Sequence, residues 1–234
     1  MSKALDTQSG NGDFSRIDEF DKQANYGPAN FDRRHIFNFN WVYEIPGRRD
    51  AGPVIRAIAN DWQLSGGYRW ESGAPYGIGW TVSGVNNQNI TGSFTEPSRV
   101  IILGDPGKGY SSDPYQQIRV DVFAPAQVGS RGLESGRNYL NRAPINNLDL
   151  SLQKSFPILG RGRAVRFRLD AFNALNHTQF DNVAGTIQFR SLSDPTPINL
   201  PYDDQGRLVR TNGFGAVTSV RPPRVLQLLV RFDF

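Results

Sequence analysis

The sequence contains no cysteine, a single methionine and two histidines. Without cysteine, neither a disulfide framework nor a thiolate-bound metal site can form. His35 and His177 are the only imidazoles, and we interpret each as a loop or strand-end residue, so no metal site is predicted. Blocks of lysine or arginine are also missing, because acidic and basic residues are interspersed around a net charge of +4. Nucleic acid is therefore not an expected partner.

Long apolar runs are missing as well. No segment approaches the roughly 18 apolar residues that a membrane-spanning helix needs. Helical periodicity is weak throughout, so no helix is predicted. The first seven residues have no apolar core and do not resemble a signal peptide, so an exported protein with this sequence would have to be truncated at its N-terminus. Low mean hydropathy does not exclude a membrane barrel, because every second residue of a barrel strand faces a polar lumen.

Recognisable catalytic motifs are absent. The glycine-rich stretch 104–111 lacks the spacing of a phosphate-binding loop. Asp105 and Asp113 do not follow the order of a calcium-binding EF-hand. The pair Asp203 and Asp204 lies in a proline-rich loop and is best interpreted as a solvated turn. We therefore predict no catalytic residue, no metal, no cofactor and no enzymatic activity.

What the sequence does contain is period-two alternation, which is clearest at the C-terminus. In the segment 224–234, one face of an extended strand is mostly polar and contains Val225, Gln227, Leu229, Arg231 and Asp233. The opposite face is wholly apolar and ends on a terminal aromatic residue: Leu226, Leu228, Val230, Phe232 and Phe234. A strand of about ten residues with this pattern suits a tilted crossing of the outer membrane.

Four further segments alternate in the same way, and strands are predicted near residues 35–45, 62–71, 147–156 and 164–174. The connections between the five strands alternate between short or moderate ones (46–61 and 157–163) and long ones (72–146 and 175–223). Outer-membrane barrels have short periplasmic turns and long extracellular loops. If the last strand runs toward the periplasm, every short connection lies on the periplasmic side and every long one outside.

Two sets of side chains are candidate functional residues. Aromatic residues near strand ends are expected at the membrane–water interface: Trp41, Tyr43, Trp62, Tyr68 and Trp70. Charged residues on the polar faces are expected to face the lumen: Arg69, Glu71, Arg166, Arg168, Asp170, Arg231 and Asp233. These charges either form ion pairs between neighbouring strands, with Arg166 or Arg168 near Asp233, or contact a plug or a passing solute. The residues that bind a ligand are not identifiable, although the long loops are the expected place.

The alternation alone also fits a soluble β-sandwich, in which such aromatics pack a core. Strand length favours the barrel, because soluble strands usually run about five or six residues. The first alternative is therefore a secreted carbohydrate-binding sandwich. The second, a small free-standing barrel, is less favoured because it would need its own signal peptide.

Several short motifs occur in a fixed order along the chain. They are Tyr-Gly-Pro-Ala-Asn-Phe-Asp-Arg-Arg-His (26–35), Trp-Gln-Leu-Ser-Gly-Gly-Tyr (62–68), Ser-Gly-Ala-Pro-Tyr (72–76), Gly-Arg-Asn (136–138), Asn-Asn-Leu-Asp-Leu-Ser-Leu (146–152) and Ala-Phe-Asn-Ala-Leu-Asn-His-Thr-Gln-Phe (171–180). In this order, and with the closing Phe, they resemble the C-terminal part of TonB-dependent receptors. The closest resemblance is to the Oar-like group, which carries a carboxypeptidase-regulatory-like domain ahead of the plug.

The resemblance implies a parent barrel of roughly 22 strands around a plug, with transport driven through TonB. The terminal strand, with its final Phe, would be the signal for the barrel-assembly machinery. This chain would supply an all-β, antiparallel C-terminal fragment of about five to six strands: a strand stub and extracellular loop over 1–34, then the barrel segment 35–234. Its expected partners are outer-membrane lipid, the assembly machinery and the remaining strands and plug, with TonB acting through them. Such a fragment would leave unpaired strand edges.

Overall fold

The computed structural model describes residues 3–4, 26–48, 50–85, 87–92, 98–158 and 163–234. The chain divides into two compact units. The sheet unit comprises Ile36–Glu71, Ile145–Thr178 and Pro222–Phe234. The loop unit comprises Met1–His35, Ser72–Pro144 and Gln179–Arg221.

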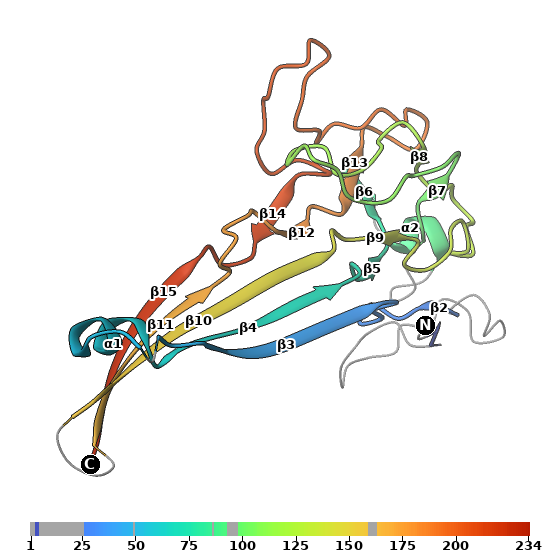
Figure 1. Cartoon of the computed structure of the whole chain (residues 1–234). Coiled ribbons are helices and arrows are strands. Elements are labelled where there is room, and N and C mark those ends of the chain that lie inside the picture. The colour runs from blue at the N-terminus through green and yellow to red at the C-terminus, as the bar shows by residue number, and fades with distance from the viewer. Residues whose placement is uncertain (1–2, 5–25, 49, 86, 93–97, 159–162) are drawn as a thin grey trace. The chain divides into compact units, whose positions relative to one another are not determined.

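The sheet unit is built on one antiparallel sheet of five long strands (Figure 1). The strands follow one another across the sheet in the order β15-β11-β10-β4-β3. Each of the five predicted strand ranges lies on one of them: β3 (Ile36–Ile45), β4 (Trp62–Glu71), β10 (Ile145–Pro157), β11 (Ala164–Phe172) and β15 (Val225–Asp233). The sheet is open, with β3 and β15 at its two edges, so these strands form a wall and not a closed barrel.

The connection between β3 and β4 contains a short helix that the sequence pattern did not predict. Helix α1 (Pro53–Ala59) has a proline in its first turn, where the missing N–H costs nothing. At seven residues it is too short to show a clear helical period, which explains why the prediction of no helix was wrong here. A second helix, α2 (Asn87–Thr91), lies in the loop unit.

The loop unit is formed by the long connections and has its own hydrophobic core. Its short strands are β1 (Lys3–Ala4), β2 (Gly27–Pro28), β5 (Pro75–Tyr76), β6 (Gly79–Val82), β7 (Ile101–Ile102), β8 (Phe123–Ala124), β9 (Leu140–Asn141), β12 (Phe180–Val183), β13 (Thr186–Phe189) and β14 (Val217–Val220). Buried side chains from both long connections, including Val100, Phe189 and Phe214, pack in this core. The long loops are therefore folded together and not independent.

The strand pairings of the loop unit were not predicted from the sequence, and two of them bear on the predicted organisation. Strand β6 pairs in parallel with β13, which joins the two long connections to each other. Residues 76–82 also alternate in the sequence, but the structure breaks this segment between β5 and β6. The predicted stub at residues 2–5 includes β1, which pairs with β2 and does not extend the five-stranded sheet; Ser2 and Leu5 lie outside the described residues.

Candidate functional site

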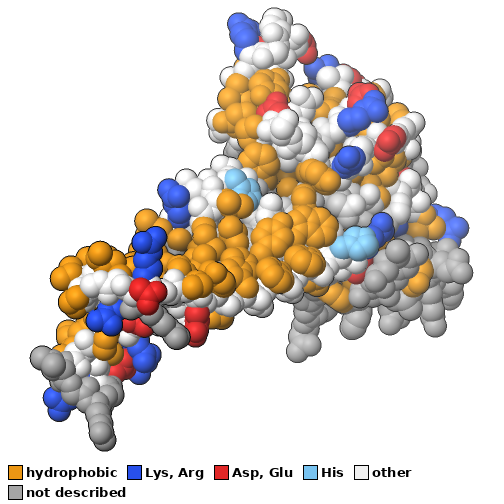
Figure 2. Space-filling view, in the orientation of Figure 1, with side chains coloured by type: hydrophobic (Ala, Val, Ile, Leu, Met, Phe, Trp, Pro, Cys, Tyr) orange, Lys and Arg blue, Asp and Glu red, His pale blue; other side chains and the backbone are white. Residues whose placement is uncertain are grey.

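Apolar residues line up across all five strands of the sheet unit. The register places Tyr43, Leu64, Leu152, Leu169 and Leu228 opposite one another in a continuous apolar row. Adjacent rows contain the other predicted apolar positions, so the five separate patterns share one face, called here the apolar face. The described residues leave much of it uncovered, and Leu228 is 69% exposed. Hydrophobic side chains gather along the sheet in Figure 2.

A soluble sandwich would cover such a face with a second sheet. In the described part of the chain, every other sheet has only two strands. All five residues of the predicted terminal signal, Leu226, Leu228, Val230, Phe232 and Phe234, are exposed. The apolar face therefore requires an apolar surrounding that the described residues do not provide.

The opposite face of the sheet is polar. Glu44, Gln63, Gln153 and Arg168 lie opposite one another on neighbouring strands. The charged residues predicted on this face form short ion pairs. Arg69 pairs with Glu71 (2.8 Å), Arg168 with Asp170 (2.8 Å), Arg166 with Asp233 (2.9 Å) and Arg231 with Asp233 (2.7 Å). The expected Arg166–Asp233 contact between β11 and β15 is therefore present.

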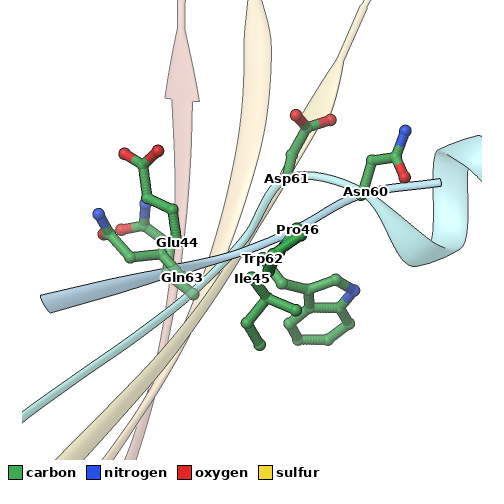
Figure 3. Close-up of a pocket in the computed structure, with 9 residues that line it drawn as sticks. Glu44, Ile45, Pro46, Asn60, Asp61, Trp62 and Gln63 are labelled. Atoms are coloured by element: carbon green, nitrogen blue, oxygen red, sulfur yellow. The ribbon is translucent and has the colours of Figure 1, made fainter. Parts of the chain in front are cut away.

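One end of this face contains a hollow of about 490 Å³. It is lined by polar side chains of β3, β4 and β10, among them Glu44, Gln63 and Gln153, and by the turn residues Asn60 and Asp61. In Figure 3 the side chains of Glu44, Gln63 and Asp61 lie on one side of the strands, and those of Ile45 and Trp62 on the other. No group of three or more metal-ligating side chains occurs among the described residues.

The predicted interface aromatics all lie on the apolar face, but at different depths. Trp62 begins β4 and Trp70 lies one residue before its end, with Tyr68 close by. Tyr43 is near the end of β3. Trp41 is different: it lies in the middle of β3, opposite Gly66, and not near a strand end as predicted. A Cβ on Gly66 would lie 2.3 Å from Cζ2 of Trp41, so the indole occupies the space that the glycine leaves.

One charged residue on the apolar face was not predicted from the sequence. Lys154 lies opposite Trp62 on β4 and Phe167 on β11, yet its side chain is almost fully buried. Its amine donates to the carbonyl oxygens of Asn60 and Ser155 and lies 4.5 Å from the ring centroid of Phe156. The alternation alone could have placed Lys154 on the apolar face, because it lies two and four residues after Leu152 and Leu150 on the same strand.

The ordered motifs meet at the ends of strands. Asn173, in the motif 171–180, donates two hydrogen bonds: its backbone N–H to Asp149 Oδ1 (2.9 Å) and its side-chain amide to the Pro222 carbonyl (3.1 Å). Its own carbonyl accepts from the Asn176 N–H (2.9 Å). In the loop unit, Asn138 of the Gly-Arg-Asn motif donates to the carbonyl of Pro28 (2.7 Å). These motif residues therefore fix where strands end and loops begin.

Two half-buried tyrosines pack against the core of the loop unit. The Tyr76 hydroxyl donates to the Gly109 carbonyl (2.7 Å), and the Tyr139 oxygen accepts from the Ile78 N–H (3.3 Å). Burial raises the pKa of Tyr139 to about 12. Burial also raises the pKa of Tyr76, against the opposing effect of the Arg142 charge. Both hydroxyls therefore stay neutral and serve as structural hydrogen-bonding groups.

An antiparallel sheet of strands about ten residues long, with one uncovered apolar face and one polar face, is the wall of a membrane β-barrel. Comparison with protein families agrees: the family described as "Outer membrane beta barrel domain" matches residues 1–227. The chain belongs to this outer-membrane β-barrel family, which confirms the predicted all-β fold class and the outer-membrane location. No curated protein and no solved structure matches the chain. Within the described residues, no helix is long and apolar enough to cross a membrane.

Proposed function

We propose that this chain is the C-terminal portion of a TonB-dependent receptor, of the Oar-like group, which takes up or binds a ligand at the cell surface. The observation that supports the proposal is that the loop unit is folded. Its two long connections share one hydrophobic core and are joined by the parallel β6–β13 pair. A passive pore does not require long connections that share a folded core, whereas a receptor requires loops held in a defined shape to select a ligand.

The two faces of the sheet have distinct roles in this proposal. The apolar face contacts outer-membrane lipid, with Trp41, Tyr43, Trp62, Tyr68 and Trp70 as the proposed interface aromatics. The polar face lines the lumen, where the ion pairs around Asp170 and Asp233 keep the wall hydrophilic next to a plug. The edges β3 and β15 pair with the remaining strands of the parent barrel, which satisfies their free backbone groups in lipid.

The role is binding and transport and not catalysis. The barrel-assembly machinery would recognise β15 through its apolar residues and Phe234, and TonB would act through the plug. The ordered motifs support the receptor group, because the motif residues Asn138 and Asn173 hold segments that are distant in sequence at fixed strand ends.

The proposal is tested by uptake in cells. Strains with the intact gene and with the gene disrupted are grown on a mixture of peptides and oligosaccharides, and depletion of each compound from the medium is measured with and without a protonophore. A TonB-coupled receptor predicts at least one compound whose depletion needs both the gene and the proton-motive force. Gene-dependent depletion that the protonophore leaves unchanged would indicate a passive pore and would contradict the proposal.

A further inference from the structure

Helix α1 presents a fixed apolar surface that no described residue covers. Val54, Ile55 and Ile58 are 71%, 54% and 62% exposed. At about 100° per residue these three fall on one side of the helix, and Arg56 falls on the opposite side. A surface helix of a water-soluble protein would turn such an apolar side toward its core.

The C-terminal end of α1 is held firmly by hydrogen bonds. The Trp62 indole N–H donates to the Ile58 carbonyl (2.7 Å). The side-chain oxygen of Asn60 accepts a hydrogen bond from the Arg48 N–H (2.7 Å). The backbone carbonyl of Asn60 accepts from the Lys154 amine. The Ser155 N–H donates to the Asp61 carbonyl (3.1 Å). Exposure of the apolar side chains is therefore a built feature of this connection.

The same contacts join α1 to the apolar face of the sheet. Trp62 lies on that face, opposite Ile45 on β3 and Lys154 on β10. The helix surface is therefore continuous with the surface that faces lipid in an outer-membrane barrel. This continuity identifies lipid as the occupant of the helix surface.

The position of Lys154 indicates the depth of this end of the sheet. A lysine on a lipid-facing surface is costly at the centre of the bilayer and is tolerated where its amine reaches the polar boundary. Here the amine turns toward the carbonyl of Asn60, directly after α1. Trp62, with an apolar ring and a bonded N–H, suits the same boundary.

We propose that α1 is an interfacial helix that lies along the headgroup boundary and inserts Val54, Ile55 and Ile58 among the acyl chains of phospholipids. The proposal rests on the membrane placement of the apolar face given under the proposed function. If the last strand runs toward the periplasm, the β3–β4 connection and its helix α1 lie at the periplasmic leaflet. The helix fixes the height of the barrel wall in the bilayer at the β3–β4 turn.

The test uses the lack of native cysteine in this chain. Single cysteines replace Val54, Ile58, Arg56 or Leu228 in the assembled full-length barrel, and each carries an environment-sensitive fluorophore. The protein is placed in vesicles of phosphatidylethanolamine and phosphatidylglycerol with brominated acyl chains. Quenching at residues 54 and 58 should be at least about twofold stronger than at residue 56, because interfacial helices bury only their apolar side.

Two controls make the outcome decisive. Leu228→Cys reports the sheet: if it is quenched while residues 54 and 58 behave like residue 56, the helix proposal fails and the membrane placement stands. If Leu228→Cys is not quenched, the membrane placement itself fails. Trp62→Phe removes the hydrogen bond to α1 and should weaken quenching at residue 58, whereas Trp70→Phe, on the same face but distant along β4, should not.

Discussion

Gly66 and Trp41 show how a missing side chain on one strand makes room for a large one on the next. The two residues lie opposite each other on the apolar face, and any Cβ at position 66 would overlap the indole. The arrangement covers the exposed glycine backbone with an aromatic ring, as in designed sheets. The sequence alone reveals the alternation of both strands but not this pairing, because the register depends on how β3 and β4 are aligned.

The variant Gly66→Ala is expected to lower the free energy of unfolding by about 1–2 kcal/mol, because the indole must move from its place. Denaturant titration of the folded protein in detergent measures the change. Gly67→Ala is the matched control: its Cβ would meet only the Asn40 amide oxygen at 2.9 Å, and that amide can rotate. Equal losses in the two variants would contradict the account.

Asn173 provides a second residue-scale prediction. Its backbone has a φ of 50°, and its buried side chain donates to the Pro222 carbonyl. Asn173→Ala should cost about 1–3 kcal/mol, because it loses this hydrogen bond and strains the left-handed backbone. Asn173→Gly also loses the hydrogen bond but adopts the positive φ without strain, so it should lower the free energy of unfolding less than Asn173→Ala in the same titration. If glycine is no better than alanine, the backbone conformation is not part of the cost.

At the scale of whole elements, the sequence predicted the long strands well and the short elements poorly. A period of two over about ten residues leaves little room for another interpretation, and β4 begins and ends at the predicted residues. Helix α1 and the short strands of the loop unit span too few residues to show a period. Their positions depend on contacts with distant segments, such as Lys154 with Asn60 and β6 with β13.

Adjacent positions on β10 test which face meets lipid. Leu152→Arg places a charge in the middle of the apolar row and should cost about 2–4 kcal/mol near the bilayer midplane. Gln153→Arg, one residue along the strand, faces the opposite side; it lies opposite Arg168, so it should cost up to about 1 kcal/mol, less than Leu152→Arg. The yield of the folded, heat-modifiable form in isolated outer membranes measures both variants. A better yield for Leu152→Arg than for Gln153→Arg would reverse the assignment of the two faces.

At the scale of the molecule, the loop unit should respond to alkaline pH. Tyr139 has its pKa raised from 10.0 to about 12 by burial, so the folded state binds this proton more tightly than the unfolded state does. Its contribution to stability is complete below pH 10 and is lost progressively as the pH rises from 10 to 12.

Tyrosinate absorbance follows this loss directly. Some tyrosine signal in the folded protein should appear only near pH 12, whereas the denatured protein should titrate near pH 10. Tyr139→Phe should remove part of the late signal. If the folded and denatured proteins titrate alike, the hydroxyls are not buried as described.

The parallel pairing of β6 with β13 has a consequence for the order of synthesis. Residues such as Val100 and Phe214 reach the same core from opposite halves of the sequence, so this core is complete only after the second long loop has been made. Folding of the loop unit is therefore a late step, because it needs residues from almost the whole length of this chain.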